Sequence, residues 1–163
     1  MIQVNYWGAV HCTFHALDEL KKSNGSICVI SSLVGLTGKF EIFFKKLGVP
    51  TRTGYSASKH ALHGFFHSLK IELSNEVKIS IVCPGFVLTE IHHKAIGSTE
   101  DVKREEKKFM TAQECSNIII ETIEDGKFLE IMTLLGKLGF YLKPFCQPLL
   151  DKVAASKIQQ VKK

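Results

Sequence analysis

The fold is decided by a short apolar run that two serines follow, Ser26-Ile27-Cys28-Val29-Ile30-Ser31-Ser32. The run is nearly continuous and rich in β-branched residues, which is typical of a strand in a parallel sheet with both faces covered. The polar pair at its end predicts that the strand stops at Ile30. We therefore expect an α/β domain with a buried strand at residues 26–30.

Helices and strands alternate on both sides of this run. Apolar residues at helical spacing begin at Val4 and continue until Ser23-Asn24-Gly25, which predicts a helix that ends there. A second apolar stripe predicts a helix over 55–73, and a β-branched run that Pro84-Gly85 closes predicts a strand over 77–83.

The last predicted helix begins at a recognisable N-cap. Thr111, with Glu114 three residues later, has the pattern of a capping box, and the apolar residues after it predict a helix that stops at Gly126. Residues 128–132 are a candidate strand. Alternation of helix and strand is typical of a Rossmann-like, doubly wound parallel sheet, and the chain has the element order of one half of that fold.

Composition is that of an ordinary globular domain. The chain has 163 residues, 45% hydrophobic and 23% charged, within the range of one domain. Five scattered cysteines without a Cys-x-x-Cys pair favour buried thiols in a reducing compartment over a disulfide framework or a zinc site. We see no signal peptide at the start and no apolar run of the roughly 18 residues that a spanning helix needs.

One pair of residues carries recognisable chemistry. Tyr55 and Lys59 stand four residues apart on a predicted helix, so their side chains share a face. A free phenol is a poor base at neutral pH, but a fixed ammonium beside it favours the phenolate. Ser31-Ser32 and Pro84-Gly85 follow the two neighbouring strands, where open α/β sheets bind ligands.

These motifs together resemble the short-chain dehydrogenase/reductase family. The resemblance covers about residues 2–135 and rests on four motifs in the family's order: Asn5 with Gly8, the strand 27–35 with its two serines, the run 55–62 that begins Tyr55-Ser56-Ala57-Ser58-Lys59, and the segment 84–89. It is nearest to the membrane-associated, hydroxysteroid-dehydrogenase-like branch of animal reductases.

The resemblance implies a catalytic role for each of four residues and a nicotinamide cofactor, NADP or NAD. Tyr55 is the expected general acid and base, and Ser32, rather than Ser31, is expected to bind the oxygen of an alcohol or carbonyl substrate. Lys59 is expected to assist Tyr55 and hold the nicotinamide ribose, and Asn5 to position a water. The residues expected along the nicotinamide are Pro84, Gly85, Val87 and Thr89, besides Tyr55 and Lys59.

Each of these residues also has a purely structural interpretation. Asn5 is a plausible helix N-cap, Ser31 and Ser32 are plausible strand terminators, and Thr89 is a plausible cap for a following helix. Lys59 is then one more solvated lysine.

The sequence departs from the family in its cofactor motif. No Gly-x-Gly-x-x-Gly or Gly-x-x-x-Gly-x-Gly occurs, so the turn that binds the cofactor's pyrophosphate is missing. We expect a truncated isoform or fragment with an open edge at strand 26–30 and with little or no dehydrogenase activity. The alternative is a non-enzymatic protein that binds a partner through this edge, as a homodimer or as a heterodimer with a full-length homologue. The choice between NAD and NADP stays open.

Residues 39–48 resemble an insertion, because deleting them restores a smooth family-like loop before Tyr55. Their apolar residues suit a substrate lid, and extra sequence in a tolerant loop explains them equally well. We therefore predict a partial catalytic domain over 1–135, with the insertion inside it, and a basic, apolar tail over 136–163.

The tail holds the whole excess of positive charge. Six lysines from Lys137 onward face one acid, Asp151, within a net charge of +5, so the remaining chain is neutral and nucleic-acid binding is not expected. Lysines among aromatics suit an anionic membrane surface, on the cytoplasmic side or at the endoplasmic reticulum, whereas a pocket lid or a dimer contact is the alternative.

The chain is also rich in histidines near Lys59. His60, His63 and His67 recur at helical spacing, but a third kind of metal ligand is missing. We expect these histidines on a partly solvated helix face or in an oligomer contact, and we assign no metal.

Overall fold

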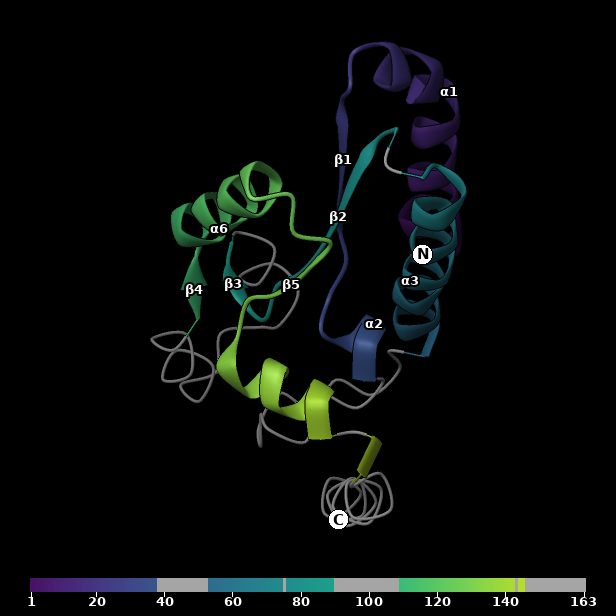
Figure 1. Ribbon diagram of the computed structural model, residues 1–163. Coiled ribbons are helices and arrows are strands. Elements are labelled where there is room, and N and C mark those ends of the chain that lie inside the picture. The colour runs from purple at the N-terminus through teal and green to yellow at the C-terminus, as the bar shows by residue number, and fades with distance from the viewer. Residues whose placement is uncertain (38–52, 75, 90–108, 143, 146–163) are drawn as a thin grey trace, which may run out of the picture.

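The computed structural model describes residues 1–37, 53–74, 76–89, 109–142 and 144–145 (Figure 1). The predicted insertion at 39–48, His92-His93, Cys146 and most of the predicted tail lie outside these residues.

A three-stranded parallel sheet forms the centre of the described chain. Its strands are β1 (Ser26–Ile30), β2 (Lys78–Cys83) and β5 (Leu129–Ile131), in the order β1-β2-β5. In register, Val29 pairs with Ile81, and Ile81 pairs with Leu129. Every residue of β2 after Lys78 is buried, as expected of a central strand covered on both faces. The predicted α/β class is confirmed.

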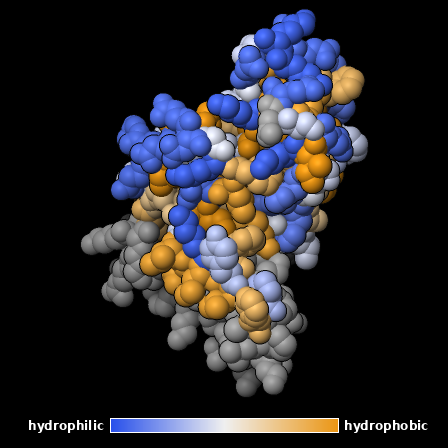
Figure 2. Space-filling model, in the orientation of Figure 1, coloured by the Kyte–Doolittle hydropathy of each residue, from blue (hydrophilic) through white to orange (hydrophobic). Residues whose placement is uncertain are grey.

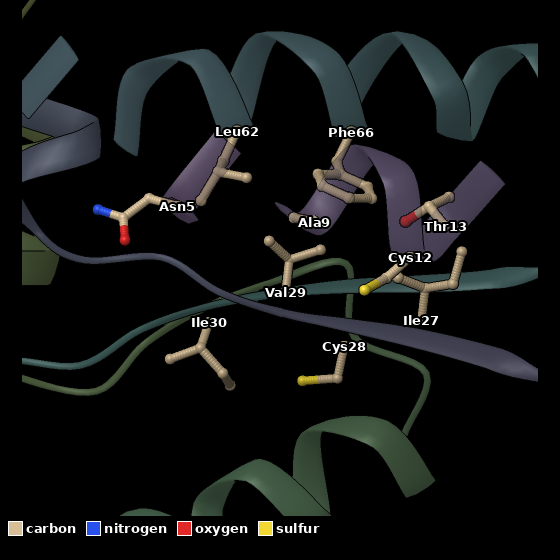
Figure 3. A pocket seen from close by; sticks show the side chains of 10 residues that line it. All are labelled: Asn5, Ala9, Cys12, Thr13, Ile27, Cys28, Val29, Ile30, Leu62 and Phe66. Atoms are coloured by element: carbon tan, nitrogen blue, oxygen red, sulfur yellow. The ribbon is translucent and has the colours of Figure 1, made fainter. Parts of the chain in front are cut away.

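Helices cover both faces of this sheet, so the doubly wound arrangement is also confirmed. On one side lie the π-helical turn η1 (Ile2–Trp7), α1 (Gly8–Lys22) and α3 (Thr53–Glu72), and on the other lies α6 (Ala112–Glu124). Figure 3 shows α3 above β1 and α6 below it. A short helix, α2 (Val34–Thr37), follows β1, and residues 134–142 form a further helix after β5.

The predicted helix ends follow from local backbone chemistry. Asn24 has φ 51° in the turn after α1, and Gly126 has φ 65° after α6, the left-handed conformation that asparagine and glycine tolerate. At the start of α6, Thr111 Oγ1 accepts from the Glu114 amide at 3.2 Å, and the Glu114 carboxylate accepts from the Thr111 amide at 2.8 Å. The predicted capping box is confirmed.

The core lies between α3 and the sheet. Leu62, Phe66 and Leu69 of α3 pack against Val29 of β1 and Ile81 of β2. Phe66 is 1% exposed, and burying a side chain of this size stabilises a fold by roughly 1.5–3 kcal/mol. This packing fixes α3 across the pair β1 and β2.

The structure differs from the sequence prediction at three places. The first helix begins at Ile2, two residues before the predicted start at Val4, because its first six residues wind as a π-helix. Two short strands, β3 (Val87–Leu88) and β4 (Met110–Thr111), pair in parallel beside the stacked rings of Phe86 and Phe109, whose centroids are 5.1 Å apart. The helix over 134–142 was not predicted.

Two glycines of the helix over 134–142 give a matched test of its packing. A Cβ at Gly136 would lie 2.5 Å from Leu33 Cδ2, 2.7 Å from Thr133 Oγ1 and 2.9 Å from Ile131 Cγ2, whereas a Cβ at Gly139 meets nothing within 4 Å. We expect Gly136→Ala to lower the free energy of unfolding by about 1–3 kcal/mol through overpacking. Gly139→Ala should raise it by about 0.5–1 kcal/mol, because alanine favours a helix. Urea unfolding measures both, and equal effects would show that this helix does not dock on the core.

Candidate active site

The carboxyl ends of β1 and β2 meet the helix that carries Tyr55 and Lys59. Ser31 and Ser32 follow β1 directly, and α3 places Lys59 against the same point, since Lys59 Nζ donates to the Ile30 carbonyl at 2.8 Å. The same ammonium lies 5.8 Å from the centre of the Tyr55 ring. The structure therefore brings Tyr55, Lys59 and the serine-bearing end of β1 into one cluster.

Lys59 is held in a partly buried position. Burial lowers the pKa of its ammonium, and the nearby Cys83 opposes that change. Its hydrogen bond to the Ile30 carbonyl compensates part of the lost hydration, so a cation stays fixed beside the phenol ring of Tyr55. A solvated surface lysine, the structural alternative, does not describe this side chain.

The two serines after β1 have different surroundings. Ser31 is 4% exposed, and its hydroxyl shares a hydrogen bond with His63 Nε2 at 2.9 Å. Ser32 is only half-buried, and its hydroxyl accepts from the Val34 amide at 3.4 Å. Ser31 is thus committed to an internal partner, while Ser32 is the serine nearer to solvent.

Asn5 is tied to the first turns of α3. It lies inside η1, not at a helix N-cap, so the N-cap interpretation is wrong. Its Nδ2 donates to Ser58 Oγ at 3.0 Å, and Ser58 Oγ donates to the Tyr55 carbonyl at 2.7 Å. Irregular π-helical turns occur often at functional sites, and here one brings Asn5 to the backbone of Tyr55.

The residues predicted along the nicotinamide follow β2. Pro84 and Gly85 are half-buried, Val87 lies in β3, and Thr89 is exposed. A Cβ at Gly85 would lie 2.7 Å from Thr133 Cγ2, so this turn has room for glycine only. Whether Thr89 caps a helix concerns residues outside the described chain.

His63 is the residue near the site whose burial the sequence did not reveal. It is 8% exposed, so the predicted solvated face is wrong at this position. Burial, together with the charges of His67, His60 and Lys59, lowers the pKa of its imidazole to about 4. Its position beside the apolar stripe of α3, next to Leu62, is the signal that could have indicated burial.

Among the described residues, no group of three or more His, Cys, Asp or Glu side chains could hold a metal ion. The described cysteines Cys12, Cys28, Cys83 and Cys115 are free thiols. Burial raises the pKa of Cys83 to about 12, so this thiol stays protonated next to the site.

A pocket of about 200 Å³ lies beside the cluster (Figure 3). Both faces of β1 line it, because Ile27 and Val29 point toward α3 while Cys28 and Ile30 point to the opposite side. It therefore follows the edge of β1 away from β2, and of the predicted site residues it includes Asn5.

Comparison with known proteins identifies the family. The sequence model described as short chain dehydrogenase matches residues 1–100, and the chain belongs to this family of oxidoreductases. A "Dehydrogenase/reductase SDR family protein 7-like" of Dictyostelium discoideum is 40% identical over 98% of this chain and 48% of its own length. A Drosophila melanogaster protein of the same description is 30% identical over 94% of this chain and 46% of its own length. The chain thus spans about half the length of these relatives.

Solved structures show the same fold. A short chain dehydrogenase from Burkholderia cenocepacia, in complex with NADP, matches with a TM-score of 0.69 and 19% identity, over 93% of this chain and 56% of that one. A 4-hydroxyisoleucine dehydrogenase mutant complexed with NADH and succinate matches with a TM-score of 0.62 over 80% of this chain and 55% of that one. The Rossmann-like prediction is confirmed.

Acidification is expected to destabilise the protein through His63. Its pKa is about 4 in the folded chain against 6.5 for an ordinary histidine, so between these values only the unfolded chain binds the proton. The contribution of His63 to the free energy of unfolding is therefore fully present above pH 6.5. It is lost as the pH falls toward 4, and the loss is on the order of 3 kcal/mol. Urea unfolding at neutral and at acidic pH should show a smaller acid loss for His63→Gln than for the wild type.

The exposed His60 offers the matched control for this measurement, because it lies on the same helix. His60→Gln should keep the wild-type loss on acidification. An equal loss in wild type and His63→Gln would show that His63 takes up its proton in the folded chain.

Proposed function

We propose that this site interconverts an alcohol and a carbonyl with a nicotinamide cofactor. The observation that carries the proposal is the position of Lys59, whose ammonium is fixed between the Ile30 carbonyl and the Tyr55 ring at the carboxyl end of β1. Ligands of open α/β sheets bind at this end of the strands, and the family is one of oxidoreductases.

The side chains fit the nicotinamide end of the cofactor. Lys59 has three N–H donors, of which the Ile30 carbonyl takes one, so the ammonium can also bind a ribose hydroxyl. At the end of β2, Gly85 packs so closely on Thr133 that a side chain would not fit. The sequence has no glycine-rich turn for the pyrophosphate, so the proposal concerns the nicotinamide half of the cofactor alone.

The proposed chemistry balances as a hydride and a proton transfer. A reduced nicotinamide, when bound, would supply the hydride for the carbonyl carbon. Tyr55 gives its phenolic proton to the carbonyl oxygen and takes it back in alcohol oxidation, while Ser32 hydrogen-bonds that oxygen. Lys59 favours the phenolate after the proton has left. Asn5 supports this end of α3 through Ser58 and the Tyr55 carbonyl.

A second candidate function is the binding of a protein strand without catalysis. Among the described residues β1 has one sheet neighbour, β2, and a pocket follows its other edge. Ile30 is 46% exposed there. An unpaired strand edge with apolar surface favours the addition of a strand from another chain.

Titration with NADPH and with NADH distinguishes the two candidates. We expect saturable binding of at least one of them, and Lys59→Ala should weaken it at least about tenfold, the size of one charge-assisted hydrogen bond. Tyr55→Phe should retain binding within about threefold and lose turnover. A folded chain that binds neither nucleotide contradicts the oxidoreductase proposal and favours the partner-binding one.

We also propose that the helix over 134–142 contacts a membrane surface. No helix among the described residues is long and apolar enough to span a membrane. However, Leu134, Leu138, Tyr141 and Phe145 recur at helical spacing and are 51–84% exposed. Figure 2 shows apolar surface gathered over the lower part of the molecule, where Figure 1 places this helix. An exposed apolar face suits the surface of a bilayer, and the half-exposed Lys137 of the same helix suits anionic lipid.

Sedimentation with phosphatidylserine vesicles tests this contact. The double variant Leu138→Asp, Tyr141→Asp should reduce vesicle binding at least about tenfold, because each large apolar side chain contributes roughly 1.5–3 kcal/mol when buried. Phe14→Asp is the control, since Phe14 is 73% exposed but lies on α1. Equal loss in both variants, or none in either, contradicts the proposed contact.

A further inference from the structure

His63 occupies the same face of α3 as the two residues of the proposed active site. It follows Lys59 by one helical turn and Tyr55 by two, and side chains four residues apart lie above one another on a helix. His60 and His67 on the same helix are exposed, whereas the His63 ring is enclosed.

The imidazole contacts the carboxyl ends of β1 and β2. Its Nε2 lies 2.9 Å from Ser31 Oγ, directly after β1, and 3.7 Å from Cys83 Sγ, the last residue of β2. Ser31 and Cys83 are 4% and 0% exposed, so these contacts are shielded from water. A single side chain thus joins α3 to the two strand ends that bear Ser32 and Pro84.

Two neighbouring hydrogen bonds join α3 to the end of β1. Lys59 Nζ holds the Ile30 carbonyl at 2.8 Å, and His63 holds the next residue, Ser31. The Ser31 amide in turn donates to the Val82 carbonyl at 2.8 Å. Ser32 follows Ser31 directly in the chain, so its position relative to Tyr55 depends on these hydrogen bonds.

The segment after Ser31 has no spare room against α3. A Cβ at Gly35 would lie 2.9 Å from the Lys59 carbonyl oxygen, 2.9 Å from Ser31 Oγ and 3.0 Å from His63 Cδ2. In Figure 1, α2, which contains Gly35, lies beside α3. The backbone around the serines is therefore packed directly on His63 and its neighbours.

An apolar side chain at position 63 would cost less free energy of folding than the buried imidazole does. His63 Nδ1 is buried and has no hydrogen-bond partner among the described residues. An unpaired buried nitrogen destabilises a fold, and an apolar side chain of similar size avoids that cost. The imidazole is neutral at neutral pH, because burial and the charges of His67, His60 and Lys59 on α3 together lower its pKa to about 4. The His63 imidazole therefore supplies a hydrogen bond near Lys59 without adding a second positive charge there.

We propose that His63 is a positioning residue of the active site, whose hydrogen bond to Ser31 fixes Ser32 and the Ile30 carbonyl relative to Tyr55 and Lys59. This inference rests on the proposed oxidoreductase function. His63 itself touches neither substrate nor cofactor in this arrangement, and it acts through Ser31.

Three variants of the full chain separate positioning from packing. His63→Gln keeps an amide nitrogen near the place of Nε2, His63→Leu keeps apolar volume and removes the hydrogen bond, and Ser31→Ala removes the other partner. His60→Leu is the control, because it makes the same change at an exposed position of α3. Two readouts are measured, NADPH oxidation with benzaldehyde as carbonyl probe, and hydrogen exchange of the Ser31 amide.

Positioning predicts a split between kcat and KM. His63→Leu should lower kcat at least about tenfold, the worth of one buried hydrogen bond, while KM for NADPH changes less than about twofold. His63→Gln should recover kcat to within about threefold of the wild type. Ser31→Ala should match His63→Leu, and the double variant should lose no more than either one, because both remove one interaction.

Hydrogen exchange gives a readout that does not depend on activity. In His63→Leu the Ser31 amide should exchange at least about tenfold faster than in His63→Gln, while the Ile81 amide, bonded to the Phe128 carbonyl at 2.7 Å, keeps its rate. If the wild type neither binds nor oxidises NADPH or NADH, the oxidoreductase proposal fails, and exchange at Ser31 still decides the role of His63. Unchanged exchange at Ser31 in His63→Leu, or an unchanged kcat in an active wild type, overturns the inference.

Discussion

The parallel pairing of β1 with β2 is the constraint on which the site depends. Because the strands run in the same direction, their carboxyl ends lie at one edge of the sheet, and α3, which connects them, must return along the face of the sheet. The buried side chains of α3 fix its position along the strand direction, so Tyr55 and Lys59 lie at the end of β1 rather than at its middle. The site is in this sense a product of the core, since the contacts that bury Leu62 and Phe66 also set where Lys59 meets Ile30.

The β5 side and the β1 side of the sheet have different surroundings. Beyond β2 the sheet continues to β5, and the helix over 134–142 packs Gly136 against Leu33 and Thr133. Along β1 the described residues leave a row of backbone groups next to a pocket, and the pocket reaches Asn5. The cluster of Tyr55, Lys59 and the serines thus lies where β1 meets β2, and Asn5 adjoins the pocket along the outer edge of β1.

Much of this arrangement could be predicted from sequence because it follows from local rules. The strand at 26–30 is apolar and β-branched throughout, and the Thr111 and Glu114 pair specifies the start of α6 by two reciprocal hydrogen bonds. Spacing alone placed Tyr55 and Lys59 on one face. What could not be predicted depends on contacts distant in sequence. His63 resembles His60 and His67 in the chain, and only the ends of β1 and β2 distinguish it, through Ser31 and Cys83.

The helix over 134–142 and the π-helical winding of η1 escaped prediction for a related reason. Lysines interrupt the apolar pattern around Lys137, and its ammonium is accommodated by Glu130 of β5 at 3.0 Å, a partner that spacing does not reveal. In η1, the Asn5 side chain donates a hydrogen bond to Ser58, 53 residues later in the chain. Helical periodicity carries no information about that contact.

Cys83 shows a further consequence of the burial of β2. A thiol with a pKa of about 12 is ionised in roughly one molecule in a hundred thousand at pH 7, and the thiolate is the form that peroxides and electrophiles attack. The Cys83 thiol beside Lys59 and Ser31 therefore stays protonated, while Cys12 on α1 is the exposed thiol among the described cysteines. Among the described thiols, an oxidant is therefore expected to modify the one on the outer helix α1 before the one at the end of β2.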